Sequence, residues 1–341
     1  MSDRLDFRSD NVWGASPEIL AALAEANAGA AVPYGGDDWT KALDARFAEL
    51  FETEVTVFPL AIGTAANALA LAAMSPPWGV IYCHASGHVQ VDECGAPEFF
   101  TGGAKLLPLP GANGKLTPEV LEPAIFGAGT VHHVQPAGVT LSQATECGTV
   151  YSVAEVQALS QVCLDQGLAL HMDGARFANA LVGTNASPAE ITWKAGVDLL
   201  TFGATKNGCF AAEALVVFKP ELAESLALRR KRAGHLFSKM RFVSAQLLAY
   251  LEDDLWLANA RRANACAQVL AAALQQAGAT LAYPVQANEI FAHLPGDLAQ
   301  RLSDQGLLFL PWPDAGPDAH RFVTSFAGDP EALRAQLAAL L

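Results

Sequence analysis

The sequence predicts an α/β protein with a large domain, built on a mostly parallel sheet, and a smaller C-terminal α+β domain. Short apolar runs alternate with Ala- and Leu-rich helical stretches along most of the chain, a pattern typical of βα units. The pattern changes near residue 234, where a long helical stretch precedes short strand-like segments. We therefore expect a large domain over residues 1–233 and a small domain over residues 234–341. A length of 341 residues agrees with about two domains.

The individual elements follow from capping signals and apolar periodicity. A Ser cap followed by Pro, a Gly-Thr turn and a Ser-x-x-Glu capping box predict helices over residues 16–27, 63–75 and 152–166. Apolar runs predict strands over residues 80–83, 106–109, 131–135, 168–172, 197–202 and 215–218. In the small domain we expect a long helix over residues 243–276, strands over residues 290–294, 307–310 and 321–324, and a closing helix after Asp329-Pro330.

Composition and charge exclude several classes of protein. An apolar fraction of 52% with 16% charged residues excludes a disordered chain. The net charge of −14 argues against binding to nucleic-acid phosphates. The six cysteines form no C-x-x-C pair, so they match neither a disulfide framework nor a zinc site, and they suit a reducing compartment. No signal peptide or membrane-spanning run is visible, so we expect a cytoplasmic protein whose partner is a small molecule and not a membrane.

Three candidate functional groups follow expected strands: Gly63-Thr64, Asp173 and Lys206. Each alone has an ordinary interpretation, as a turn, a helix cap or a solvated lysine. Together they describe a binding site, because groups at the carboxyl ends of parallel strands meet at one edge of a sheet. A free helix N-terminus binds phosphate, a partly buried lysine forms a Schiff base, and an aspartate stabilises a protonated pyridine nitrogen. These properties indicate pyridoxal 5′-phosphate as the cofactor.

The motifs resemble those of the low-specificity L-threonine aldolase family, in the aspartate-aminotransferase-like (fold type I) group of pyridoxal-phosphate enzymes. The most specific match is His171-Met-Asp173-Gly-Ala-Arg176, followed downstream by Thr205-Lys206-Asn-Gly208. Arg321 is a weaker match to the C-terminal arginine of the family. Further matching segments, in the order of the family, cover residues 6–11, 34–37, 63–67 and 88–93.

The resemblance implies a role for each cofactor residue. Lys206 holds the cofactor covalently, Asp173 pairs with its pyridine nitrogen, and His88 stacks on its ring. Gly63 and Thr64 bind the phosphate, with a contribution from Thr205.

The resemblance also implies how the substrate binds. Arg176 and Arg321 hold the α-carboxylate through their planar guanidinium groups, and Ser9 adds a hydrogen bond. On spacing alone, a surface salt bridge is the favoured interpretation of Arg176, and only its position three residues after Asp173 in the motif favours substrate binding. Ser9 can equally be an ordinary turn residue.

The expected reaction is retro-aldol cleavage of a β-hydroxy-α-amino acid, such as L-threonine or L-allo-threonine, to glycine and an aldehyde. A base removes the β-hydroxyl proton, and His88 and His133 are the candidates because imidazole titrates near neutral pH. The pair His132-His133, placed at the end of an expected strand, reads equally well as structural.

One position departs from the family pattern. Many members carry an aromatic residue four positions after the stacking histidine, where this chain has Asp92. If Asp92 lines the pocket, the enzyme admits bulkier or more polar substrates, including the aryl group of phenylserine.

Other interpretations stay open. The same cofactor residues serve β-elimination, racemisation and transamination, and a catalytically silent scaffold of the same fold is the alternative from another class. The pair His171–Asp173 lacks a third ligand at suitable spacing, so no metal is expected. The basic run Arg229–Arg232 reads as an interface or a solvated helix end. The resemblance implies a homotetramer built as a dimer of dimers.

Overall fold

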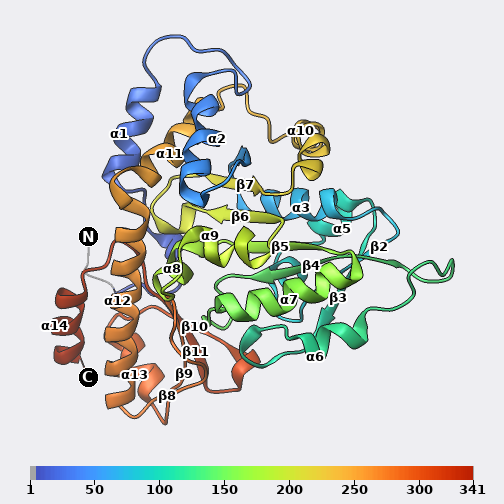
Figure 1. Cartoon of the computed structure of the whole chain (residues 1–341). Helices are drawn as coiled ribbons and strands as arrows, with labels where there is room; N and C mark the ends of the chain where they lie inside the picture. Colours follow the sequence, from blue (N-terminus) through green and yellow to red (C-terminus); the bar gives the residue numbers. More distant parts are fainter. Residues whose placement is uncertain (1–4, 341) are drawn as a thin grey trace.

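Two β-sheets organise the protein, and the computed structural model describes residues 5–340 (Figure 1). The larger sheet has the strand order β1-β7-β6-β5-β4-β2-β3. Strand β7 runs antiparallel to both β1 and β6, and the remaining neighbours are parallel, so the expected mostly parallel sheet is confirmed. The strands are β1 Thr56–Leu60, β2 Gly79–His84, β3 Lys105–Leu109, β4 Gln135–Ser142, β5 Ala169–Gly174, β6 Leu199–Gly203 and β7 Glu213–Val217.

Helices cover both faces of this sheet, which is why its central strands carry apolar residues on both sides. Successive residues of β6 illustrate this, because Leu199 packs into the core on one face and Leu200 into the core on the other. The first face carries α3 (Gly63–Met74). The helices α5 (Ala96–Thr101) and α10 (Ala223–Arg232) pack against α3. The second face carries α2 (Asp38–Phe51), α7 (Val153–Gln166), α8 (Phe177–Val182) and α9 (Pro188–Ile191).

The smaller sheet is antiparallel, in the order β10-β11-β9-β8. Its strands are β8 Thr280–Leu281, β9 Glu289–His293, β10 Leu310–Pro311 and β11 Ala319–Val323. Its helices are α12 (Leu255–Gln276), α13 (Leu298–Asp304) and α14 (Pro330–Leu340). No helix within residues 5–340 has both the length and the apolar character needed to cross a membrane.

The apolar contacts divide inside α12, which spans both cores. Trp256 and Ala260 belong to the core of the large sheet, as does α11 (Arg241–Leu251), whereas Cys266 and the residues after it belong to the second core. Phe7 from the N-terminal segment also joins the second core. The domain boundary expected at residues 233/234 stays a prediction.

Three expected elements differ from those in the structure. Residues 131–134 are not a strand, because β4 begins only at Gln135, whose side-chain amide donates hydrogen bonds to the carbonyls of Gly127, Thr130 and His133 and closes a turn there. The helix expected over residues 243–276 is two helices, because Asp253 and Asp254 adopt left-handed backbone angles between α11 and α12. In the small domain, only Leu310 of the strand expected over residues 307–310 joins the sheet.

Strand direction decides where the functional groups meet. Strands β1, β5 and β6 point the same way, so their carboxyl ends lie at one edge of the sheet. The turn into α3 follows β1, Asp173 lies near the end of β5, and the 3₁₀ turn Thr205–Asn207 follows β6. The antiparallel strand β7 begins at this edge with Glu213, opposite Leu60 and Gly203.

The aromatic cluster around Phe202 predicts a large stability effect. Phe202 is 0% exposed, and its ring centroid lies 5.2 Å from that of Phe47 and 5.6 Å from that of Trp256. We expect Phe202→Ala to lower the free energy of unfolding by about 3–5 kcal/mol, because the cavity that it creates cannot collapse fully. Urea denaturation measures this. Phe99→Ala, at a ring that is 78% exposed, should change the stability by no more than about 0.5 kcal/mol, and equal losses in both variants would contradict the prediction.

Candidate active site

A cavity of about 220 Å³ opens at the carboxyl edge of the large sheet. It brings together six of the residues that the sequence singled out: Gly63, Thr64, His88, Asp173, Thr205 and Lys206. Asn11, Asn67, Ala175 and Glu213 also line it. A larger cavity of about 620 Å³ lies around Tyr151, Thr184 and Lys194 and contains none of these six residues. Chemistry, and not volume, therefore identifies the candidate site.

The N-terminus of α3 forms one wall of the cavity. Its first backbone N–H groups have no partner within the helix, and the N-cap residue Ile62 supplies no side-chain cap. Open space surrounds the α-carbon of Gly63, so an anion can approach the backbone closely. The helix dipole adds a partial positive charge at this end. These features suit a phosphate group.

A hydrogen-bond network links Asp173 to His88 on the opposite wall. The Asn67 side-chain amide donates to Asp173 Oδ2 at 2.9 Å and to Glu93 Oε1 at 2.7 Å, and Glu93 Oε1 lies 2.8 Å from His88 Nδ1. Asp173 also accepts a bond from the backbone N–H of Ala175 at 3.0 Å. The carboxylate of Asp173 is thereby held in the cavity, where it can pair with a protonated ring nitrogen.

The same network sets the protonation of the two groups next to Asp173. The hydrogen bond that His88 donates to Glu93 raises the pKa of His88, and the negative charges of Asp173 and Glu146 add to this effect against the opposing effect of burial. Burial raises the pKa of Glu93, while its hydrogen bond to His88 acts in the opposite direction. A positively charged or hydrogen-bonded imidazole is therefore favoured at this wall.

Lys206 lies on a short turn that hydrogen bonds to Tyr250 and Trp256 stabilise. The Asn207 amide donates to the Tyr250 hydroxyl at 2.6 Å and to the Trp256 carbonyl at 2.8 Å. Gly208 follows with a φ of 119°, and a side chain there would collide with Ser16 and Asn259. The turn after β6 thus has one conformation, and it places Lys206 on the cavity wall.

Arg176 is buried beside the cavity and carries two acidic partners. Its Nε and Nη2 donate to Asp10 at 2.8 and 3.2 Å, and its Nη1 lies 3.4 Å from Glu289. Burial opposes its charge, but Asp10, Glu289 and Glu146 outweigh that effect and raise the pKa of Arg176. Arg176 also lowers the pKa of Asp10 despite the burial of that carboxyl group. The ion pair is therefore buried, unlike the surface salt bridge considered from the sequence.

Arg321 and Ser9 are the other two residues expected to bind the substrate carboxylate. Both lie at the N-terminal segment of residues 8–10, which also contains Asp10. The Arg321 guanidinium donates to the Arg8 carbonyl at 3.3 Å and lies 4.9 Å from the centre of the Trp312 ring. Ser9 Oγ accepts a hydrogen bond from the backbone N–H of Asn11 at 3.1 Å. Residues 8–10 therefore run between Arg321 and Arg176, and neither arginine lines the cavity itself.

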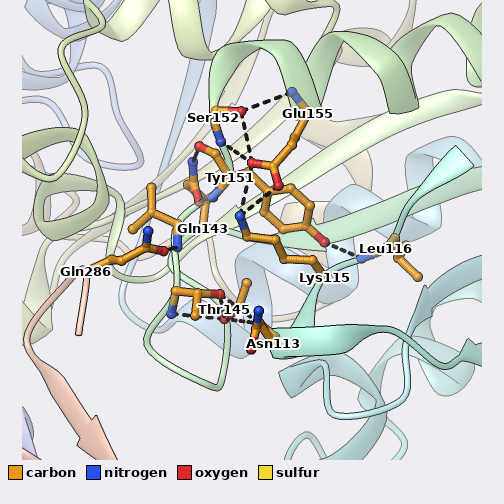
Figure 2. Close-up of polar contacts among 11 residues, drawn as sticks. Asn113, Lys115, Leu116, Gln143, Thr145, Tyr151, Ser152, Glu155 and Gln286 are labelled. Carbon is orange, nitrogen blue, oxygen red and sulfur yellow. Dashed lines mark hydrogen bonds and ion pairs between the residues drawn. The ribbon is translucent and has the colours of Figure 1, made fainter. Parts of the chain in front are cut away.

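A loop after β4 adds a further acidic group, Glu146. Figure 2 shows how polar contacts hold this loop: the Gln143 side chain bonds both the N–H and the carbonyl of Tyr151, at 2.9 Å each. Thr145 and Thr149 bond the carbonyl of Asn113 on a neighbouring turn, at 3.2 and 2.7 Å. The carbonyl of Asp173 accepts from the Gln143 N–H at 2.7 Å, so the loop begins beside the cavity. The charge of Glu146 acts on both His88 and Arg176.

Two expected site residues lie elsewhere in this chain. His133 does not end a strand: it is exposed in the turn before β4, at the opposite edge of the sheet from Lys206, and its ring packs against Phe126. Asp92 is exposed at the C-terminal end of α4 (His88–Val91) and is not part of the cavity wall. The reason for the first difference is that β4 starts at Gln135 and extends to Ser142, so residues 131–134 precede the strand.

The possible metal ligands also differ from the pair considered from the sequence. His171 hydrogen-bonds Thr140 at 2.9 Å and Thr201 at 3.1 Å, and burial lowers its pKa to about 4, so it is a neutral structural residue. Ligand atoms of His88, Glu93 and Asp173 lie within 4.8 Å of one another. The hydrogen bonds through Asn67 already account for this grouping.

Sequence reasoning missed several acidic and amide groups of the site. Asn67, Glu93 and Asp10 lie inside segments that the resemblance had matched, so closer attention to those segments would have found them. Glu213 and Glu289 lie in no such segment. Both begin strands in the structure, and the apolar runs that revealed those strands start after them.

The fold and the cavity together define a class of protein, the aspartate-aminotransferase-like (fold type I) enzymes. A structure of an aspartate aminotransferase from Thermus thermophilus superimposes with a TM-score of 0.72, at 17% identity, over 100% of this chain and 97% of that one, which shows the shared fold. A threonine aldolase structure from Leishmania major superimposes with a TM-score of 0.91, at 29% identity and 98% coverage of both chains.

The sequence comparisons narrow this class to a family. The family model described as beta-eliminating lyase matches residues 6–296, and the chain belongs to this family, whose members are lyases that depend on pyridoxal phosphate. A low specificity L-threonine aldolase of Pseudomonas aeruginosa is 46% identical over 96% of this chain and 94% of its own length. A second, from a Pseudomonas strain, is 44% identical over 94% of this chain and 92% of its own length.

The Glu93–His88 hydrogen bond predicts a measurable change in titration. Glu93→Gln replaces a carboxylate with a neutral amide, which stabilises the imidazolium ion less, so the pKa of His88 should fall. A pH titration of the histidine side chains by NMR measures it. Glu54→Gln, an exposed position between α2 and β1, should leave the pKa of His88 unchanged. An unchanged pKa in the Glu93 variant would show that the bond does not control His88.

Proposed function

We propose that this protein is a pyridoxal-phosphate-dependent aldolase that cleaves L-threonine, L-allo-threonine and related β-hydroxy-α-amino acids to glycine and an aldehyde. The observation that carries the proposal is the shared cavity: Lys206, Asp173 and the open N-terminus of α3 meet within it. Relatives that are 44–46% identical over nearly their whole length are low specificity L-threonine aldolases, which supports this choice of reaction.

The residues of the cavity fit this cofactor in charge and in shape. The N-terminus of α3, at Gly63 and Thr64, would bind the phosphate, with Thr205 beside it. Asp173, held by Asn67, would pair with the pyridine nitrogen, His88 would stack on the ring, and Lys206 would hold the cofactor covalently. When bound, pyridoxal phosphate supplies an electron sink that stabilises negative charge on the substrate Cα.

Arg176 would bind the substrate carboxylate, with Ser9 in the segment of residues 8–10 and Arg321 on the other side of that segment. The planar guanidinium of Arg176 already binds one carboxylate, that of Asp10, in a two-bond arrangement. Its Nη1 faces Glu289 at 3.4 Å, a longer contact. The site is thus built for carboxylate recognition, and substrate binding requires these acidic partners to share or release the guanidinium.

His88 is the base that we propose for the β-hydroxyl proton, because it is the histidine on the cavity wall. As the proton moves to the imidazole, the Cα–Cβ bond breaks and the aldehyde leaves, and protonation of Cα then gives glycine. Glu93 would orient the His88 ring through Nδ1 and leave Nε2 free for the substrate. His133 lies outside the cavity and is not part of this proposal.

Other reactions on the same scaffold give other products. β-Elimination, racemisation and transamination need the same cofactor residues, so product analysis separates them from aldol cleavage. A catalytically silent scaffold would be distinguished from an enzyme by its failure to bind the cofactor.

We also propose that the protein acts in the cytoplasm as a homotetramer. Light scattering coupled to size-exclusion chromatography tests the assembly.

Replacement of Lys206 tests the function directly. The purified protein should show an absorbance band near ~420 nm that borohydride abolishes, and it should release aldehyde from L-threonine. Lys206→Ala should lose both the band and the aldehyde release. Lys194→Ala is the matched control, because Lys194 pairs with Glu52 on the surface, away from the cavity. A variant without Lys206 that still cleaves L-threonine would disprove the assignment.

We propose that Asp92 influences the choice of side chain from outside the cavity wall, since it is exposed one turn after His88. Asp92→Phe restores the aromatic residue of many family members, so it should shift the ratio of kcat/KM for L-threonine to that for phenylserine. Steady-state kinetics with both substrates measures the ratio. Asp38→Phe, on the exposed start of α2, serves as the control. An unmoved ratio in Asp92→Phe would exclude a role in specificity.

A further inference from the structure

Glu213 is a buried acidic residue that the proposed reaction leaves unused, although it lines the cavity. It is the first residue of β7 and pairs with Leu60 of β1 on one side and Gly203 of β6 on the other. Leu60 directly precedes the turn into α3, and Gly203 directly precedes the turn that carries Lys206. Its position therefore lies between the helix N-terminus and the lysine.

The contacts of Glu213 hold its carboxyl group in this position. Its Oε2 accepts a hydrogen bond from the backbone N–H of Ala204 at 3.0 Å. The neighbouring Thr205 is held in turn, because its hydroxyl bonds both the carbonyl and the N–H of Ala212, at 3.2 and 3.1 Å. The carboxyl group thus loses its hydrogen bond to the turn at the end of β6 if it moves out into solvent.

The charged surroundings of Glu213 are sparse. Lys206 is the cation that faces it, and the titratable neighbours Cys209 and Tyr250 are buried, which raises the pKa of both, so they are uncharged near neutral pH. The other walls of the cavity contribute His88 and Asp173. The elements β1 and α3 contain no titratable side chain. Burial raises the pKa of Glu213 to about 7, against the hydrogen bonds of Thr205 and Ala204 and the charge of Lys206.

We infer that Glu213 takes up a proton when a phosphate group binds at the N-terminus of α3, so that phosphate-bearing ligands bind less tightly as the pH rises. Two anions inside a cavity of about 220 Å³ repel each other more strongly than in bulk water, because the protein walls lower the effective dielectric constant around them. Lys206 offsets one negative charge, and protonation of Glu213 removes a second. By linkage, a ligand that favours the protonated carboxyl group binds more weakly once that group is ionised.

This inference rests on the proposed cofactor site, and the experiment separates the two. The full-length protein, freed of cofactor, is titrated with pyridoxine 5′-phosphate, which has no aldehyde and so cannot react with Lys206. We expect its Kd to rise between pH 7 and 9 by up to about tenfold per pH unit, the limit for one coupled proton. In Glu213→Gln, the Kd should change by less than about twofold per unit over the same range.

Two controls test whether the pH dependence requires the phosphate group of the ligand and whether it is specific to the position of Glu213. Pyridoxine lacks the phosphate, so its Kd should show no difference in pH dependence between the wild type and Glu213→Gln. Asp198→Asn removes a partly buried carboxyl group, which bonds the Leu170 N–H at 2.8 Å and precedes β6 at the opposite edge of the sheet. That variant should keep the wild-type slope for pyridoxine 5′-phosphate.

A second measurement needs no variant. Calorimetric titration of the wild type in two buffers with different ionisation enthalpies should report uptake of about one proton per bound pyridoxine 5′-phosphate near pH 8. Equal pH slopes in the wild type and Glu213→Gln, or an absence of proton uptake, would overturn the inference. If neither pyridoxine 5′-phosphate nor pyridoxal phosphate binds at any pH, the proposed function itself fails.

Discussion

The common direction of β1, β5 and β6 is the constraint on which the site depends. Because these strands point the same way, the residues that follow them meet at one edge, although Gly63, Asp173 and Lys206 are far apart along the chain. The strand β7 reverses direction between β1 and β6, so its first residue reaches the same edge. Helix α3 then presents its N-terminus there because it follows β1 after a short turn.

Buried acidic groups give the site its second organising feature. A carboxylate that is removed from water needs hydrogen bonds or an opposite charge, and each buried acid here is stabilised by different partners. Asp173 uses Asn67, Glu93 uses His88 and Asn67, and Asp10 uses Arg176. Through these contacts each acid also orients a neighbour, so the network that stabilises the charges positions the proposed catalytic groups as well.

The comparison with known proteins shows that a shared fold does not imply a shared reaction. The aminotransferase structure shares the whole architecture at 17% identity, so the fold alone does not select a reaction. The Leishmania major threonine aldolase structure is closer in both measures, with a TM-score of 0.91 and 29% identity. We propose that side chains in and around the cavity distinguish the reactions on such a scaffold, here His88 with Glu93, and Arg176 with its acidic partners.

The sequence by itself determined the fold class and the order of most strands and helices, and it singled out the candidate cofactor residues, because apolar periodicity and the motif around Asp173 are local along the chain. Only the tertiary structure decided which of these residues meet. It placed His133 at the far edge, since β4 begins later than its apolar run suggested, and it brought Asn67 and Glu213 into the cavity, with Glu93 bonded to Asn67 and His88 behind the wall. Such contacts join residues that are distant in sequence, and they depend on strand order and direction, which no local pattern records.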